Sequence, residues 1–282
     1  MKIKFGVNTL VWVLDFSEKG FSLLEKTKNM GFDAIELTPG DEFRKMDPEK
    51  LHKKLDELGL EVSLCGIFNE SNDISTDDAV IRQRGIDYMR DYTDWGKEIG
   101  ARIIGGPLFS ALGKKRYLPD EERKAEWDRS ADSLKRIGED AAKKGFIIAM
   151  EPINRFEIDM INTASQAIQM CEQVDNPSIK MMLDTFHMNI EDINIGDEIR
   201  ASKKHLVHFH TCANHRGVPG NDHIPWGEVN KALNDIDYEG YGVIESFAQG
   251  EVAAFANIWR PLVEDQDDIP REGLKFLRKA LK

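Results

Sequence analysis

The chain has 282 residues, 41% of them hydrophobic, and a formal net charge of −12 from 38 basic and 50 acidic side chains. This length is typical of one α/β barrel and allows a large buried core. The acidic balance argues against a nucleic-acid partner, because phosphate binding requires clustered Lys and Arg side chains.

Three cysteines without a repeated spacing argue against a disulfide scaffold, and the absence of a CxxC pair argues against a zinc ribbon. No apolar stretch approaches the roughly 20 residues that a membrane-spanning helix requires. The apolar N-terminal run lacks a small-residue cleavage site and predicts a buried first strand rather than a signal peptide. We therefore expect a cytoplasmic protein that does not enter the membrane.

Short β-rich runs alternate with longer amphipathic segments along the chain. The predicted strands are residues 3–9, 34–37, 61–66, 101–106, 146–151, 179–184, 205–210 and 241–245. The predicted helices are residues 18–30, 48–58, 78–99, 119–144, 165–174, 196–203, 226–233 and 271–281. A glycine follows several of these helices just before the next strand, as expected of a helix C-cap.

Strands rich in Val, Ile and Leu without polar alternation are typical of parallel strands that are buried on both faces. Eight strand–helix units in a chain of this length favour an α/β fold of the (β/α)8 barrel type over an open doubly wound sheet. Because no glycine-rich linker divides the chain, we expect residues 1–282 to form one domain.

Four consecutive predicted strands end in a side chain that can bind a metal ion. These residues are Glu151, Asp184, His210 and Glu245, separated by 33, 26 and 35 residues. Each interval is about one β/α unit, so the four side chains are predicted to lie at the C-terminal rim of the barrel, where barrel enzymes build their active sites. Such ligands suit Mn²⁺, Co²⁺ or Mg²⁺.

Each of these residue types also has common structural roles that need no metal ion. A single carboxylate at a strand end is more often a helix N-cap or an ion-pair partner, but four on consecutive strands are hard to explain in that way. His208 faces the same way as His210, and we expect it to be an interior histidine. Cys212 is expected to be a small buried residue rather than a ligand.

Two glutamates beside one metal ion indicate proton transfer at a carbon next to a carbonyl group. One carboxylate can remove the proton while the other returns a proton on the opposite face, which inverts that carbon. The metal ion stabilises the enediolate as a Lewis acid. Loops after the strands offer further polar groups for substrate binding, namely Asn154, Arg155, Glu157, His187, His215, Arg216, Asn221, Asp222 and His223.

Four segments then make the sequence familiar: MEPINRFE, MLDTFHMNIED, HFHTCANHRGVPGNDHIPW and GVIESF. In this order they resemble the ketose 3-epimerase family, which includes D-tagatose 3-epimerase and D-psicose (D-allulose) 3-epimerase, within the sugar isomerase/epimerase barrels. The likeness extends over nearly the whole chain and is most specific in its second half.

The resemblance implies a role for each matching residue. Glu151, Asp184, His210 and Glu245 match the ligands of one divalent metal ion, usually manganese or cobalt. Glu151 and Glu245 match the two acid/base residues that exchange the C3 proton through a cis-enediolate. Glu157, His187 and Arg216 match residues that hold the O1 to O3 end of a ketose. The resemblance also implies a homodimer or homotetramer.

The chain departs from this family in its first strand and loop. Asn8 and Thr9, followed by Trp12 and Phe16, stand where the family has an aromatic-rich segment, and we expect these positions to contact the far end of the sugar. Hexuloses such as D-tagatose, D-psicose and D-fructose, the pentulose L-ribulose and substituted keto-sugars are all open as substrates.

Three alternative functions share parts of this pattern. A sugar isomerase, an inosose-type enzyme or a lyase acting on an oxidised sugar would also begin from an enediolate. A metal-dependent abasic-site endonuclease would require several metal ions and a basic surface, which seven histidines and the −12 charge argue against. A non-catalytic sugar-binding barrel would not need both glutamates.

Overall fold

The computed structural model describes the backbone of residues 1–282 and every side chain apart from those at positions 251 and 255. Eight parallel strands pair in chain order and close into a barrel, since β1 pairs with both β2 and β8. The strands are β1 (Lys2–Asn8), β2 (Ala34–Leu37), β3 (Glu61–Cys65), β4 (Ile103–Gly106), β5 (Ile147–Met150), β6 (Ile179–Asp184), β7 (Leu206–His210) and β8 (Glu239–Ile244). The predicted (β/α)8 fold is confirmed.

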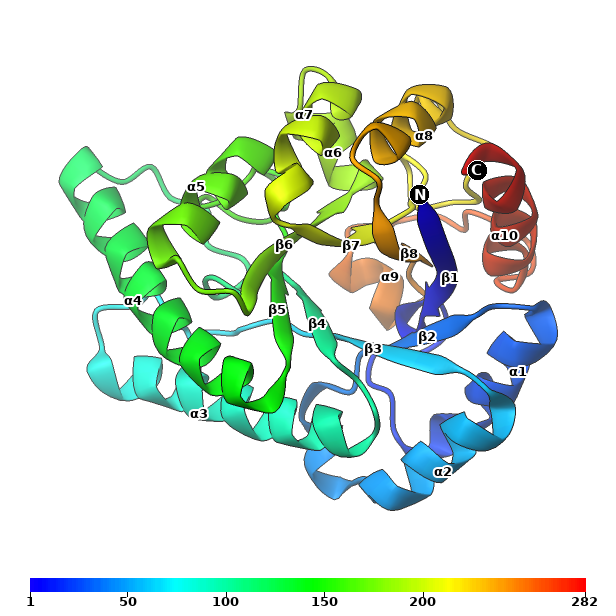
Figure 1. Cartoon of the computed structure of the whole chain (residues 1–282), viewed down its shortest axis with the longest axis horizontal. Helices are drawn as coiled ribbons and strands as arrows, with labels where there is room; N and C mark the ends of the chain where they lie inside the picture. Colours follow the sequence, from blue (N-terminus) through cyan, green and yellow to red (C-terminus); the bar gives the residue numbers. More distant parts are fainter.

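Helices surround the barrel, and the C-terminal helix α10 closes their ring between α8 and α1 (Figure 1). The helices are α1 (Ser22–Met30), α2 (Pro48–Leu58), α3 (Ala79–Glu98), α4 (Asp120–Lys144), α5 (Ala164–Val174), α6 (Thr185–Glu191), α7 (Ile195–Ala201), α8 (Trp226–Asp235), α9 (Glu251–Phe255) and α10 (Asp268–Ala280). In the part of the chain that the structure describes, no helix combines the length and the apolar character needed to cross a membrane.

The ends of the helices follow the signals in the sequence. Gly31, Gly59 and Gly145 adopt the left-handed conformation directly after α1, α2 and α4, where a glycine carries no Cβ penalty. Asp47 caps the start of α2, because its carboxylate accepts hydrogen bonds from the backbone N–H groups of Glu49 and Lys50. These caps explain why the predicted helix ends match the structure so closely.

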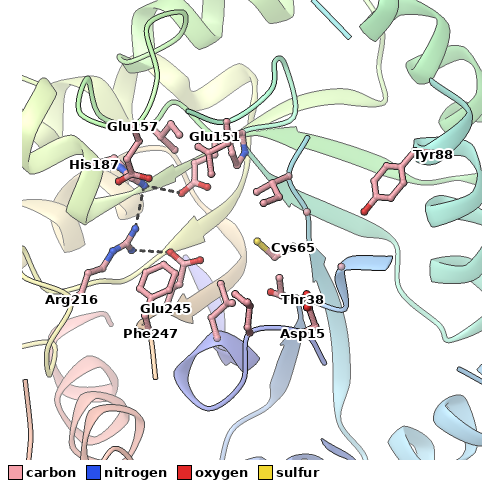
Figure 2. A pocket seen from close by; sticks show the side chains of 18 residues that line it. Asp15, Thr38, Cys65, Tyr88, Glu151, Glu157, His187, Arg216, Glu245 and Phe247 are labelled. Atoms are coloured by element: carbon pink, nitrogen blue, oxygen red, sulfur yellow. Dashed lines mark hydrogen bonds and ion pairs between the residues drawn. The ribbon is translucent and has the colours of Figure 1, made fainter. Parts of the chain in front are cut away.

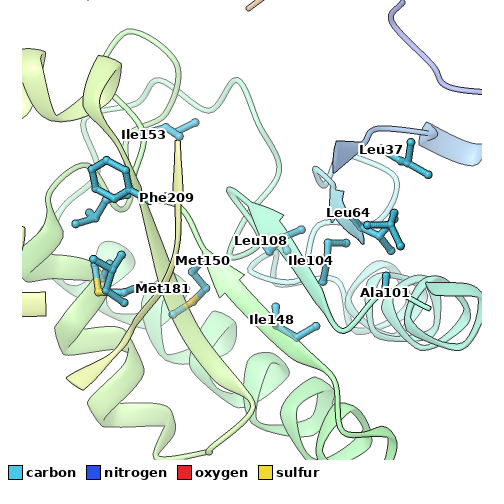
Figure 3. Packing of buried hydrophobic residues seen from close by; sticks show 14 of the residues in the cluster. Leu37, Leu64, Ala101, Ile104, Leu108, Ile148, Met150, Ile153, Met181 and Phe209 are labelled. Carbon is cyan, nitrogen blue, oxygen red and sulfur yellow. The ribbon is translucent and has the colours of Figure 1, made fainter. Parts of the chain in front are cut away.

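Successive residues of each strand face opposite sides of the barrel wall. The outward-facing set is apolar and packs against the helices, as Figure 3 shows for Leu37 on β2, Ile104 on β4 and Phe209 on β7. The inward-facing set includes Glu36 on β2 and His208 on β7, both fully buried. Apolar packing thus holds the wall in place while the barrel interior carries polar side chains.

A close approach of the backbone fixes the ends of β3 and β4. Gly106 has a φ of +130°, and a Cβ atom at this position would lie 2.1 Å from the carbonyl oxygen of Gly66. The carbonyl group of Gly106 in turn accepts a hydrogen bond from the backbone N–H of Glu151 at 2.8 Å. Only glycine allows this contact, which sets the position of Glu151 above β5.

Several elements of the structure were not predicted, among them the short helix α9 and the 3-10 helix η3 (Gly40–Lys45). The helix expected over residues 18–30 is divided into the short 3-10 helix η2 (Glu18–Gly20) and α1. An extra helix, α6, begins immediately after β6, with Asp184 as its N-cap. This short helix replaces the loop that a βα unit was expected to have at this point.

Candidate active site and metal centre

The four predicted metal ligands lie at the C-terminal ends of four neighbouring strands. Asp184 and His210 are the last residues of β6 and β7, while Glu151 and Glu245 directly follow β5 and β8. All four side chains are buried. The strand register of the barrel therefore brings together side chains that are far apart in the sequence.

The imidazole of His210 stands at the centre of this group. Its Nδ1 atom lies 3.8 Å from Oε1 of Glu151, 3.9 Å from Oδ2 of Asp184 and 3.6 Å from Oε2 of Glu245. Its other nitrogen, Nε2, lies 2.7 Å from Oε1 of Glu36. One nitrogen of the ring thus faces three carboxylates, and the other is occupied by a fourth.

The donor set of this cluster fits a divalent metal ion. Oε1 of Glu151 and Nδ1 of His210 are buried and have no hydrogen-bond partner among the described residues. Such unpaired buried atoms are costly unless a ligand satisfies them. Three carboxylates and one imidazole suit Mn²⁺, Co²⁺ or Mg²⁺. The separations of 3.6–3.9 Å are slightly wider than the roughly 3.0–3.4 Å between ligands of one small ion.

Asp184 caps a helix with one carboxylate oxygen and pairs with an arginine through the other. Its Oδ1 atom caps α6 by accepting a hydrogen bond from the N–H of Phe186 at 2.8 Å. Its Oδ2 atom faces His210 and accepts a hydrogen bond from Nη1 of Arg216 at 2.6 Å. The helix cap fixes the carboxylate, so that its second oxygen is held toward the cluster.

Arg216 is a buried cation within this acidic cluster. Its Nη1 atom also lies 2.9 Å from Oε2 of Glu245, and its guanidinium stacks over the ring of Phe186 at 4.0 Å. The backbone of Arg216 has a φ of +63°, which is uncommon for a residue with a Cβ atom. Ser246 stabilises this turn by donating a hydrogen bond to the Arg216 carbonyl at 2.6 Å.

The two glutamates of the cluster are in different electrostatic environments. Burial, followed by the neighbouring carboxylates of Glu245 and Asp184, holds the pKa of Glu151 well above its usual range despite the opposing effect of His210. Burial also raises the pKa of Glu245, but Arg216 and His210 outweigh it and the net pKa is lowered. Two carboxyl groups whose pKa values are pushed apart are suited to acid and base roles.

His187 presents a proton to the same space. Its Nδ1 atom accepts a hydrogen bond from the backbone N–H of Asn154 at 3.1 Å, which places the ring proton on Nε2. Burial, with Arg216 and His210, lowers the pKa of His187 well below its ordinary value, so the ring is neutral. Nε2 of His187 lies 3.2 Å from Nη2 of Arg216. These two donors can share one acceptor oxygen of a ligand.

Glu157 lies beside His187 and is held by the same asparagine. The Asn154 side-chain amide donates a hydrogen bond to Oε1 of Glu157 at 2.6 Å. Burial raises the pKa of Glu157, and Arg216 and Asn154 offset this only in part. The loop after β5 therefore places a carboxyl group next to the two donors.

Other polar residues of these loops have structural contacts instead. The Arg155 side chain pairs with Glu191 at 2.9 Å. The carboxylate of Asp222 accepts hydrogen bonds from backbone N–H groups and from the indole of Trp226. Cys212 lies within reach of the cluster, but burial and the nearby Asp184 raise the pKa of its thiol well above the ordinary value. A protonated thiol is a poor metal ligand.

A cavity of about 240 Å³ opens beside the cluster. Figure 2 shows Glu157, His187 and Arg216 on one side, with Asp15, Thr38 and Tyr88 on the other. The rest of the cavity wall is mostly apolar and includes Leu10, Leu14, Ile67 and Leu112. Of the residues that line the cavity, all of which the structure describes, only Arg216 is an arginine or a lysine.

The far side of the cavity differs from the expectation for the first strand and loop. Leu10, Leu14 and Asp15 line it, whereas Asn8 and Trp12 do not. Asn8 is buried and donates a hydrogen bond to Oε1 of Glu36 at 2.8 Å. The indole N–H of Trp12 bonds to Asp267 at the barrel's outer side. The expectation that Asn8 and Trp12 contact the far end of the sugar is therefore not supported, since neither side chain lines the cavity.

Sequence reasoning missed Glu36. This carboxylate lies in the apolar run AIEL of β2, is fully buried, and contacts both His208 and His210 on β7 across the barrel. A charged residue inside a run that is otherwise typical of a buried strand is the signal that could have found it.

The fold and the position of the cavity define a TIM-barrel enzyme whose site is built at the C-terminal ends of the strands. Residues 24–280 match the model of the xylose isomerase-like TIM barrel family. A probable ketose 3-epimerase from Synechocystis sp. is 33% identical over 99% of this chain and 97% of its own length. A D-psicose 3-epimerase from Ruminiclostridium cellulolyticum is 31% identical over 99% and 98%.

Solved structures give the same result. The D-psicose 3-epimerase from Clostridium cellulolyticum H10, crystallised with D-tagatose, superposes with a TM-score of 0.92 at 29% identity and covers 99% of this chain and 100% of its own. The chain belongs to the xylose isomerase-like TIM barrel family and is an enzyme of its epimerase group.

Proposed function

We propose that this enzyme is a divalent-metal-dependent ketose 3-epimerase, which inverts C3 of a free keto-sugar by removing a proton from one face and adding another to the opposite face. One observation carries the proposal: Glu151 and Glu245 both face Nδ1 of His210, at 3.8 and 3.6 Å, and their pKa values are shifted in opposite directions. The full-length likeness to curated ketose 3-epimerases supports the same reaction.

Glu151, Asp184, His210 and Glu245 would hold the cation, with Mn²⁺ or Co²⁺ preferred and Mg²⁺ possible. The bound ion would supply Lewis-acid stabilisation of negative charge on the carbonyl and neighbouring hydroxyl oxygens of the sugar. The fold-family likeness and the unpaired atoms of Glu151 and His210 both support this assignment.

The two glutamates carry the proton transfer. A carboxylate on one face of the sugar takes the C3 proton, and the electron pair of the broken C–H bond moves into a cis-enediolate between C2 and C3. The other carboxyl group then donates its own proton to the opposite face of C3. Arg216, 2.9 Å from Glu245, stabilises the ionised form of that carboxylate, which suits Glu245 to take the C3 proton in one direction of the reaction. The reverse reaction exchanges the roles of the two glutamates.

Three further residues would bind the O1 to O3 end of the substrate. The Nε2 proton of His187 and the guanidinium of Arg216 converge as two donors, and Glu157 adds a carboxyl group beside them. Since Arg216 is already paired with Asp184 and Glu245, the cavity offers no uncommitted Lys or Arg for a phosphate group. The proposed substrate is therefore an unphosphorylated ketose of the D-tagatose, D-psicose, D-fructose or L-ribulose type.

The test is product analysis by chromatography after incubating metal-free and Mn²⁺-, Co²⁺- or Mg²⁺-loaded enzyme with each of these four sugars. We expect the C3 epimer from at least one ketose, loss of activity on chelation, and recovery when metal is returned. An aldose product would instead indicate a sugar isomerase. A dehydrated product from an oxidised sugar would indicate a lyase. The homodimer or homotetramer and the cytoplasmic location stay predictions.

A further inference from the structure

A fourth buried carboxylate contacts the proposed metal site from within the barrel. Glu36 points inward from β2 and is fully buried, although a lone charge in a barrel interior is costly. It faces β7, which β8 and β1 separate from β2 around the barrel, and His208 and His210 both point toward it. The proton transfer described above makes no use of this group.

Both oxygens of Glu36 are engaged. Oε1 accepts a hydrogen bond from the Asn8 amide at 2.8 Å and lies 2.7 Å from Nε2 of His210. Oε2 accepts a hydrogen bond from the Ser63 hydroxyl at 3.0 Å and lies 2.7 Å from Nε2 of His208. The contact with His210 has hydrogen-bond geometry, whereas that with His208 is close but poorly aligned.

The surroundings of Glu36 are those of an ionised carboxylate. Each of its oxygens accepts one hydrogen bond, from the Asn8 amide or the Ser63 hydroxyl, and also lies 2.7 Å from an imidazole nitrogen. An ionised carboxylate can only accept hydrogen bonds. The nitrogen of His210 that faces Glu36 must therefore be the one that carries the ring proton.

The distances assign Glu36 to a supporting role rather than to a second metal site. Its oxygens lie 2.7 Å from the two imidazole nitrogens, which is the length of a charge-assisted hydrogen bond. Two ligand atoms on one ion would be roughly 3.0–3.4 Å apart. The carboxylate oxygens that face Nδ1 of His210 lie 3.6–3.9 Å from it, beyond the length of a hydrogen bond.

We propose that Glu36 is a positioning residue, which holds the proton of His210 on Nε2 so that the Nδ1 lone pair points at the cluster and binds a divalent cation tightly. This inference rests on the metal site of the proposed function. A carboxylate behind a metal-binding histidine also makes the ring a stronger donor, and loss of such a partner typically lowers metal affinity 10- to 100-fold.

The test compares the affinity of Mn²⁺ and Co²⁺ for metal-free parent enzyme, Glu36→Gln and Ser63→Ala, by isothermal titration calorimetry without any sugar. Glu36→Gln removes the charge behind His210 but keeps the shape of the side chain. Ser63→Ala is the matched control, since it removes a hydrogen bond to the other oxygen of the same carboxylate. We expect Glu36→Gln to weaken binding about 10- to 100-fold and Ser63→Ala to stay within about threefold of the parent.

A spectroscopic signature separates positioning from general damage to the fold. The visible absorption of bound Co²⁺ should change in Glu36→Gln, because the donor strength of His210 changes, while thermal unfolding of the metal-free variant should stay close to that of the parent. Parent-like affinity and spectrum in Glu36→Gln would overturn the inference and leave the epimerase proposal standing.

The positioning role can also be tested on the parent enzyme, so that the result does not depend on whether Glu36→Gln folds. Two-dimensional ¹⁵N–¹H NMR of the histidine rings in the Mg²⁺-loaded enzyme should show His210 protonated at Nε2, with its signal assigned by its absence from the spectrum of His210→Gln. A proton on Nδ1 would refute the positioning role. If the parent enzyme binds none of the three cations, both proposals are overturned. If Glu36→Gln shows the expected loss of metal affinity but the parent is inactive on every ketose, the positioning role of Glu36 is supported and the epimerase proposal is not.

Discussion

The two halves of the cavity are built by different means. On the side of β5 to β8, buried hydrogen bonds and ion pairs hold several of the polar groups: Asp184 caps α6, Asn154 holds His187, and Arg216 joins Asp184 to Glu245. On the side of β1 to β3, the wall comes from loop residues such as Leu14 and Ile67, which are both partly exposed.

This difference separates reaction from substrate choice. Buried polar groups that bond to one another tolerate little change, because removing one leaves another unpaired. An apolar loop wall tolerates change far better and offers few directional contacts. We infer that the β5–β8 half sets the chemistry, while the β1–β3 half sets which keto-sugar fits.

The largest effect is expected for the two glutamates. Glu151→Gln and Glu245→Gln keep the size of each side chain but remove its capacity to carry a proton, and kcat for epimerisation should fall by about 10²–10⁴-fold in each. Glu239→Gln, at the exposed start of β8, is the matched control and should retain parent activity. Steady-state assays with the best ketose give the comparison. Two variants as fast as the parent would refute the mechanism.

A smaller effect is expected for Arg216, the buried positively charged side chain in the same half of the cavity. Arg216→Lys keeps the positive charge but cannot reach Asp184, Glu245 and the substrate together through one planar group. Loss of one charge-assisted hydrogen bond of about 1.5–3 kcal/mol predicts a 10- to 100-fold drop in kcat/KM. Kinetics combined with thermal unfolding measure it. An unchanged kcat/KM would show that Arg216 neither binds the substrate nor orients the glutamates.

The smallest effect is expected in the apolar half. Ile67→Ala widens the cavity on a partly exposed loop, so we expect the ratio of kcat/KM for a hexulose over L-ribulose to change by about 10-fold. The kcat value for the preferred sugar should change far less than in the glutamate variants. Tyr88→Phe, which removes only a hydroxyl group from the same wall, tests whether that group contributes. A large loss of kcat in Ile67→Ala would contradict the claim that the β1–β3 half sets substrate choice and not the chemistry.

The barrel could be predicted from sequence because its signals are local. Glycine caps such as Gly59 and Gly145 mark helix ends, and apolar runs mark buried strands, so the barrel followed from their order. The strand-end positions of Glu151 and His210 likewise predicted which side chains would meet. Both inferences need only the regular spacing of β/α units.

Contacts across the barrel were beyond such reasoning. The pairing of Glu36 with His210 joins residues 174 positions apart and depends on which strand faces which. The far wall of the cavity depends on the path of the loop after β1, which turns Leu14 and Asp15 toward the cavity and Trp12 away from it. Loop paths are set by tertiary packing rather than by periodicity.

The most direct test of the central claim follows deuterium by NMR while the Mn²⁺-loaded or Co²⁺-loaded enzyme acts on D-fructose, D-tagatose, D-psicose and L-ribulose in D₂O. Removal and return of a proton by Glu151 and Glu245 predicts deuterium at C3 of a ketose together with appearance of its C3 epimer. Deuterium at C1 with an aldose product, or no exchange in any of the four sugars with metal bound, would contradict the account.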